Sequence, residues 1–212
     1  MNTDDLIGSL VADSSRPPAS PKRAFGLLLP LGVIAAFCLF VLVLDMRPDF
    51  RSALGSWRYL FKIAVAASIA LFGLVLLFRL ARPEQSAKHL ARWILFALAP
   101  LGLGMAIEAV SVPMSQWPES AMGYRALYCL LLVPLISLPP LAAGLFTLRQ
   151  GAPQSPMGAG AVAGFAAGGL GALIYALHCN NDSPFYVAIW YLAAIGIVTL
   201  LGAAIGRSLL RW

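Results

Sequence analysis

Six long apolar runs, separated by short charged or proline-rich connectors, decide what this chain can fold into. They cover residues 25–45, 60–81, 91–112, 127–148, 159–178 and 187–207. Each run is long enough to cross a hydrocarbon core of about 30 Å at about 1.5 Å per helical residue. A backbone in lipid must satisfy its own hydrogen bonds, and the short alternating segments typical of a membrane β-barrel do not occur. The runs therefore predict an all-α, polytopic membrane protein with six transmembrane helices.

The composition agrees with this class and excludes a water-soluble domain. Apolar residues make up 60% of the chain and charged residues 11%, and the mean hydropathy is +0.82. These values lie far outside the usual range for a soluble protein. We expect a six-helix transmembrane domain over residues 25–212, preceded by a tail over residues 1–24.

The basic residues indicate how the helices are oriented. Of the 15 Lys and Arg residues, ten fall in the tail, the second and fourth connectors and the C-terminus. The other side holds the remaining five, Arg47, Arg51, Arg58, Lys62 and Arg125. The positive-inside rule then places both termini in the cytoplasm, as expected for a bacterial inner-membrane protein. The net charge of +6 suits anionic headgroups of the lipid bilayer, and scattered basic residues without an aromatic groove predict no direct contact with nucleic acid.

The tail has the pattern of a short amphipathic helix. Two carboxylates, Asp4 and Asp5, fall in the first turn, where the helix dipole favours anions. One apolar stripe follows, formed by Leu6, Ile7, Leu10 and Val11. Such a helix is marginal alone in water, and it would gain stability in the groove of a partner protein. Two other interpretations are a helix that lies on the headgroups and a frayed tail. The Ser- and Pro-rich residues 13–22 predict a flexible tether.

A few charged residues lie in or near the apolar runs. The mixed charges of residues 45–58 are most simply those of a solvated loop, and Lys62 can extend along its helix to reach the membrane surface. Glu108 lies inside the third run, where an ionisable residue is a functional candidate by default. The alternative for Glu108 is a carboxylate near the outer interface that simply reaches water.

Glycine spacing in the fifth run predicts close helix packing. Gly160, Gly164 and Gly168 recur every four residues and therefore lie on one helix face. Small residues at this spacing let two helix backbones approach closely within a membrane. A flexible helix of a transporter is the alternative interpretation.

Two of the three cysteines are expected at one level of the membrane. The fourth run begins on the outer side and the fifth ends there, which brings Cys129 and the adjacent pair His178 and Cys179 to the same depth. Thiols on the oxidising side of the membrane can form a disulfide, be oxidised or bind a soft metal. Cys38 lies among apolar side chains near the middle of the first run, where a thiol packs as a small apolar group.

Several segments together resemble one protein family. They are Thr3-Asp4-Asp5-Leu6-Ile7, the Cys129 segment ahead of Pro134, Leu148-Arg149-Gln150-Gly151-Ala152-Pro153, Tyr175 to Cys179 with Asp182-Ser183-Pro184-Phe185, Trp190-Tyr191 and Leu210-Arg211-Trp212. This combination is similar to the NrsF family of membrane anti-sigma factors, which are negative regulators of an extracytoplasmic-function sigma factor. Where the family often carries proline and an acidic residue after its second cysteine, this chain has Asn180 and Asn181, followed by Asp182.

The resemblance implies a regulator rather than an enzyme. It implies a six-span protein that binds a sigma factor at the cytoplasmic face, and Cys129 and Cys179 match the outer cysteines that would sense oxidants or heavy metals. We expect no resident cofactor, only transient binding of a thiophilic metal, with His178 as a possible added ligand. The tail residues Asp4 to Val11 are the expected partner-binding element. Two alternatives remain open, a small transporter or channel and a membrane thiol oxidoreductase.

Overall fold

The computed structural model describes residues 2–5, 7–8, 21–81, 90–123, 126–151 and 153–211. Within these residues, six helical segments are long and apolar enough to cross a membrane. They are α2 (Pro21–Val43), α4 (Trp57–Leu80), α5 (Leu90–Ser111), α7 (Ala126–Arg149), α8 (Pro156–Tyr175) and a last segment formed by α9 (Pro184–Tyr186), the π-helical turn η3 (Val187–Tyr191) and α10 (Leu192–Leu209). The prediction of an all-helical protein with six such helices is confirmed. The fifth helix ends at Tyr175 rather than at residue 178.

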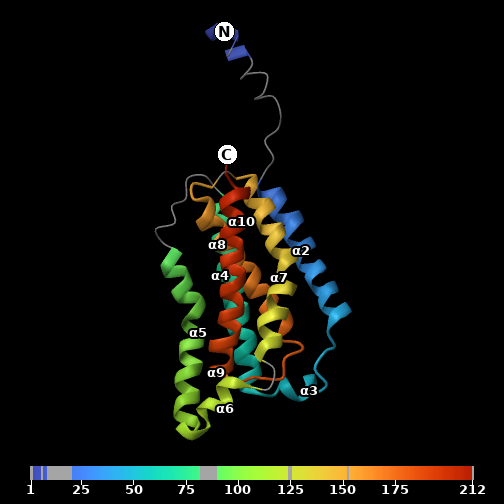
Figure 1. The fold of residues 1–212 in the computed structure, drawn as a ribbon, viewed down its shortest axis with the longest axis vertical. Helices are drawn as coiled ribbons and strands as arrows, with labels where there is room; N and C mark the ends of the chain where they lie inside the picture. The colour runs from blue at the N-terminus through green and yellow to red at the C-terminus, as the bar shows by residue number, and fades with distance from the viewer. Residues whose placement is uncertain are drawn as a thin grey trace.

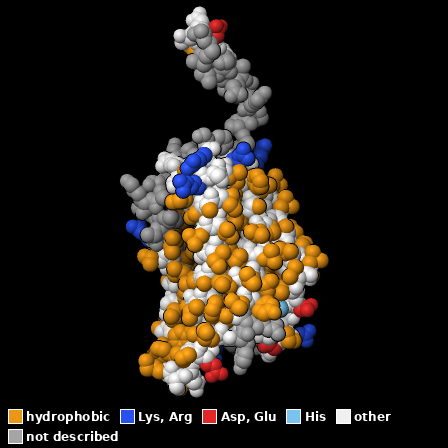
Figure 2. Space-filling model, in the orientation of Figure 1, with side chains coloured by type: hydrophobic (Ala, Val, Ile, Leu, Met, Phe, Trp, Pro, Cys, Tyr) orange, Lys and Arg blue, Asp and Glu red, His pale blue; other side chains and the backbone are white. Residues whose placement is uncertain are grey.

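The helices run up and down, so that both chain termini lie at one end of the bundle (Figure 1). We call this end the terminal end and the opposite end the distal end. The short elements α3 (Phe50–Ala53) and α6 (Trp117–Met122), with the turn η2 (Met114–Gln116), lie at the distal end. Hydrophobic side chains cover the middle of the face shown in Figure 2, while Lys and Arg side chains gather near the termini. This distribution suits a bilayer around the middle of the bundle.

Helix α8 is the packing centre, and its glycines explain why. A Cβ atom built on Gly160 would meet the Gly202 carbonyl oxygen of α10, and one built on Gly164 would meet the Val198 carbonyl oxygen. On another face, Gly169 lies against the backbone of Ala70 in α4. The four-residue glycine spacing therefore brings α8 and α10 into backbone contact, as the sequence predicts.

The buried core has two parts along the bundle. Near the terminal end it consists of aliphatic side chains such as Leu77, Leu148 and Val198. The other part includes both Cys129 and Cys179, together with Tyr175, Tyr186 and Tyr191. The fold thus places two of the three cysteines and these three tyrosines in one buried cluster in the distal half.

Candidate thiol site at the distal end

The two cysteines come from different helices but share one buried cluster. Cys129 lies in the first turns of α7 and is fully buried, while Cys179 follows α8 and is 5% exposed. Both side chains belong to the same cluster of buried hydrophobic residues. All three cysteines of the chain are free thiols, and Cys38 is exposed on α2. The structure thus holds Cys129 and Cys179 near each other in their reduced form.

Cys179 stands at the start of a short connection between α8 and α9. The backbone N–H groups of His178 and Cys179 both donate to the Tyr175 carbonyl oxygen, at 3.0 and 3.1 Å, which extends the helix end by a tight turn. Pro184 then starts α9, because proline is well accommodated in the first turn of a helix. We call residues 179–182 the thiol loop.

Two buried tyrosines line the thiol cluster. The Tyr186 side chain interacts with Cys129, and the Tyr191 side chain interacts with Cys179. Neither tyrosine hydroxyl group has a hydrogen-bond partner of good geometry among the described residues. Tyr191 ends the π-helical turn η3, a type of irregular turn that is frequent at functional sites. The cluster thus brings thiols and phenols together in the buried core.

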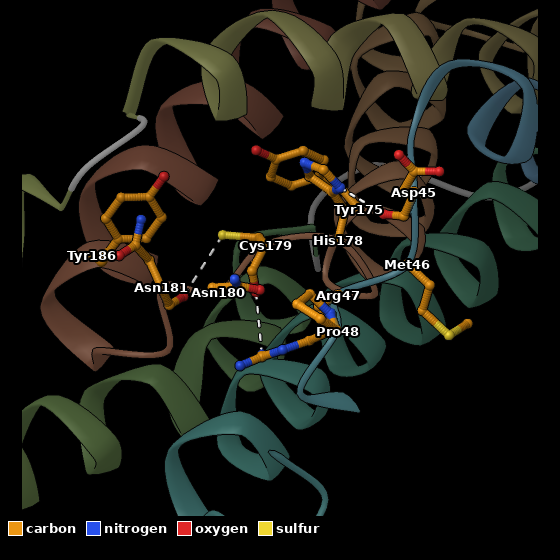
Figure 3. Close-up of a pocket in the computed structure, with 10 residues that line it drawn as sticks. All are labelled: Asp45, Met46, Arg47, Pro48, Tyr175, His178, Cys179, Asn180, Asn181 and Tyr186. Atoms are coloured by element: carbon orange, nitrogen blue, oxygen red, sulfur yellow. Dashed lines mark hydrogen bonds between the residues drawn. The ribbon is translucent and has the colours of Figure 1, made fainter. Parts of the chain in front are cut away.

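A pocket of about 410 Å³ reaches this cluster from the surface. Figure 3 shows its ten lining residues, which come from the connector after α2 and from the region around the thiol loop. Cys179 and Tyr186 form part of its wall, whereas Cys129 does not line it. A small molecule that enters the pocket therefore meets Cys179 first.

A network of charged side chains from α4 and the connector after α2 binds the thiol loop. Arg47 pairs with Asp49 at 2.8 Å and with Asp182 at 3.0 Å, and Lys62 also pairs with Asp182. The hydrogen bond with Asp49, followed by the contacts with Asp182, raises the pKa of Arg47 against the opposing effect of burial. The same bond lowers the pKa of Asp49. At neutral pH the pair of Arg47 and Asp49 therefore stays charged.

This network corrects two expectations from the sequence. The connector after α2 is not simply a solvated loop, because Arg47 is 5% exposed and bonded to Asp182, 135 positions away. Lys62 does not extend to the surface either, because its side chain is fully buried and its ammonium group donates to the thiol loop. In both cases an opposite charge, Asp182, draws the cation inward and offsets part of its desolvation.

The remaining candidates from the sequence have identifiable contacts. Glu108 is 1% exposed and pairs with Arg58 of α4 at 3.0 Å, so its carboxylate does not simply reach water. The His178 ring places Nδ1 2.7 Å from the Asp45 carbonyl oxygen, which leaves Nε2 as the atom that could bind a ligand. Within the described part of the chain, no three His, Cys, Asp or Glu side chains form a group able to hold a metal ion.

The structure describes three of the six expected partner-binding residues. Residues 3–5 and 7–8 are helical, and Asp4, Asp5 and Ile7 are exposed. Leu6, Leu10 and Val11 fall outside the described residues. Helix α2, which follows the tail in the chain, begins at the terminal end, opposite to α9 (Figure 1).

Sequence reasoning missed four residues of the site: Arg47, Lys62, Tyr186 and Tyr191. The available signal was charge balance, because Lys62 at the start of an apolar run and Asp182 at the same predicted level are opposite charges. Tyrosines inside an apolar run carry no comparable signal, since they are also common where helices meet the membrane surface.

Comparisons with known proteins cover the whole chain. A family model described as negative regulator of sigma F matches residues 10–212. The anti-sigma-F factor NrsF of Caulobacter vibrioides is 35% identical over 219 residues, which cover all of both chains. A probable anti-sigma-F factor NrsF of Azospira oryzae is 32% identical over 217 residues, again with complete coverage of both. No solved structure matches the chain.

Proposed function

This chain belongs to the family of negative regulators of sigma F, and we propose that it is a bacterial inner-membrane anti-sigma factor controlled by its distal thiols. In this proposal the terminal end faces the cytoplasm and binds an extracytoplasmic-function sigma factor. The distal end faces the oxidising side of the membrane. Membership in a regulatory family favours this role over a transporter or a thiol oxidoreductase.

The tail is the proposed binding element for the sigma factor. Its exposed helix carries Asp4, Asp5 and Ile7, and the sequence adds Leu6, Leu10 and Val11 to the same apolar stripe. A groove on the sigma factor would bury this stripe, in the manner of other amphipathic helices bound by partners. Each buried aliphatic side chain contributes about 1.5–3 kcal/mol before the cost of ordering the tail.

The observation that carries the sensing role is the reduced pair Cys129 and Cys179 in one buried cluster that a surface pocket reaches. A hydroperoxide can take two electrons from the pair, and its O–O bond then breaks to give an alcohol and water. Each thiol then gives up one proton, and a sulfur–sulfur bond forms. A thiophilic metal ion could instead bind both sulfurs as thiolates with release of two protons. Either event links the start of α7 to the end of α8.

Contacts between α2 and the end of α8 support a proposed route from the thiols to the tail. The Arg47 N–H group, after α2, donates to the Leu177 carbonyl oxygen at 3.0 Å, and His178 contacts the Asp45 carbonyl oxygen. The distal end of α2 is thus bound to the turn that carries Cys179. Since packed helices move as units between discrete arrangements, a shift here can move α2, whose other end leads to the tail. A tenfold loss of sigma-factor affinity needs about 1.4 kcal/mol.

The proposal is tested by isolating membranes that contain the full chain and measuring how much sigma factor they retain. Membranes with a chain that lacks residues 1–15 serve for comparison. Retention by the full chain and loss with the truncated chain support the proposal. Equal retention by both would place the binding surface outside the tail, and no retention by the full chain would contradict the anti-sigma role.

A further inference from the structure

We propose that Lys62 and Arg47 are positioning residues for Cys179. Resting on the proposed sensing role of this cysteine, the inference is that the two cations hold the thiol loop closed in the reduced state. They also tie movement of the loop to α4 and to the connector after α2. We call the two cations and Asp182 the loop clamp.

The Lys62 ammonium group donates hydrogen bonds to three acceptors in the thiol loop. Its Nζ atom donates to the Cys179 carbonyl oxygen at 2.7 Å, to the Asn181 carbonyl oxygen at 3.3 Å and to the Asp182 carboxylate. An ammonium group has three hydrogens to donate, and these three acceptors match them. Because the Lys62 side chain is fully buried, its desolvation has to be offset by such contacts.

Arg47 holds the same carbonyl group from a second element. Its guanidinium donates to the Cys179 carbonyl oxygen at 3.2 Å, as the dashed line in Figure 3 shows, and to Asp182 at 3.0 Å. Asp49 balances the remaining charge of Arg47. One backbone oxygen thus accepts from two cations, one on α4 and one after α2. Charge-assisted hydrogen bonds of this kind are stronger than neutral ones.

The loop clamp acts on Cys179, the cysteine with the proposed sensing role. The Cys179 sulfur points toward the Asn181 carbonyl oxygen, 3.8 Å away, and is therefore enclosed by the same loop that the cations hold. A disulfide or metal bond imposes its own geometry on Cys179. The carbonyl group on the same α-carbon then has to adjust, which pulls on Lys62 and Arg47. The loop clamp thus controls access to Cys179 and passes its movement to α4 and to the connector after α2.

The test measures how fast N-ethylmaleimide labels Cys179 in native membranes without a sigma factor. Cys38→Ser and Cys129→Ser form the background, so that Cys179 is the labelled thiol. Lys62→Met removes the ammonium group at nearly constant size, and Lys62→Met with Asp182→Asn also removes the carboxylate left behind. Arg58→Met is the matched control, because it breaks a neighbouring ion pair of α4 that does not touch the thiol loop.

Both clamp variants are expected to speed labelling of Cys179 about tenfold, while Arg58→Met changes it by less than about twofold. Unchanged labelling in the clamp variants, or equal acceleration in Arg58→Met, would overturn the proposal. Failure of both clamp variants to accumulate in the membrane would overturn it too, because Lys62 would then be needed for the fold itself. Since this assay contains no sigma factor, its failure is distinguishable from failure of the anti-sigma role.

Discussion

Arg58 of α4 and Glu108 of α5 form a two-point ion pair at the distal end of the bundle. Arg58 Nη2 lies 3.0 Å from Glu108 Oε1, and Arg58 Nε lies 3.1 Å from Glu108 Oε2. Arg58 is partly exposed, whereas the Glu108 side chain is buried at 1% exposure. This pair joins two helices at the same level as the thiol site, and it accounts for the one carboxylate within the third apolar run.

Replacement of Arg58 tests whether this pair is structural. Arg58→Met leaves the buried Glu108 charge without its partner, so we expect a loss of about 1–3 kcal/mol in unfolding free energy. Adding Glu108→Gln removes the unpaired charge and should restore part of the loss. Unfolding followed by helical circular dichroism in detergent checks both values. A double variant as unstable as Arg58→Met would contradict this assignment.

The close packing of α8 on α10 leads to a second prediction, which concerns the unfolding free energy. Gly202→Ala places a methyl group against the Gly160 carbonyl oxygen and should cost about 1–3 kcal/mol, because the backbones must separate. Gly196→Ala, on the same helix, is the control, since nothing lies within 4 Å of a Cβ atom there. The same unfolding measurement should show little loss for the control. Equal stability of the two variants would show that the contact is not needed.

The helices could be predicted from the sequence because lipid imposes a strong local rule. Long apolar runs give the spans, and the Gly160, Gly164 and Gly168 spacing gives the contact face of α8. The common depth of Cys129 and Cys179 follows from the alternation of the helices. Each of these features depends on residues that lie near one another in the chain.

The loop clamp could not be predicted in the same way, because it depends on contacts across the bundle. Lys62 and Asp182 are 120 positions apart, and Arg47 and Cys179 are 132 apart. A charged residue near the end of an apolar run usually reaches the membrane surface, which is the local rule that misplaced Lys62. Only the assembled bundle shows that a carboxylate and two carbonyl groups lie within its reach.

The proposed orientation of the bundle in the membrane can be tested by direct labelling of cysteines. Single cysteines are introduced at Asn180, exposed at the distal end, and at Ser208, exposed near the C-terminus, in a chain whose own cysteines are serine. A membrane-impermeant maleimide added to cells with a permeable outer membrane should label Asn180→Cys and spare Ser208→Cys. The opposite pattern would place the termini outside and contradict the proposed orientation.

The tail is tested by charge on its apolar stripe. Leu6→Asp with Leu10→Asp places carboxylates in the proposed contact with the sigma factor, and sigma-dependent transcription should then run without a stress signal. Ser9→Asp adds one carboxylate away from the stripe and should keep transcription low. Reporter expression and the membrane level of each variant are measured together. Continued repression by the double variant, at normal membrane level, would rule out the stripe as the binding surface.

The central claim is that the reduced pair Cys129 and Cys179 permits sigma-factor binding and that oxidation ends it. The most direct measurement is the amount of sigma factor that membranes retain before and after treatment with a hydroperoxide. Membranes with the native chain should release it on treatment and bind it again after a dithiol reductant is added. Membranes with Cys129→Ser or Cys179→Ser should bind it equally well and keep it under the same treatment. Release from all three, or from none, would contradict the account.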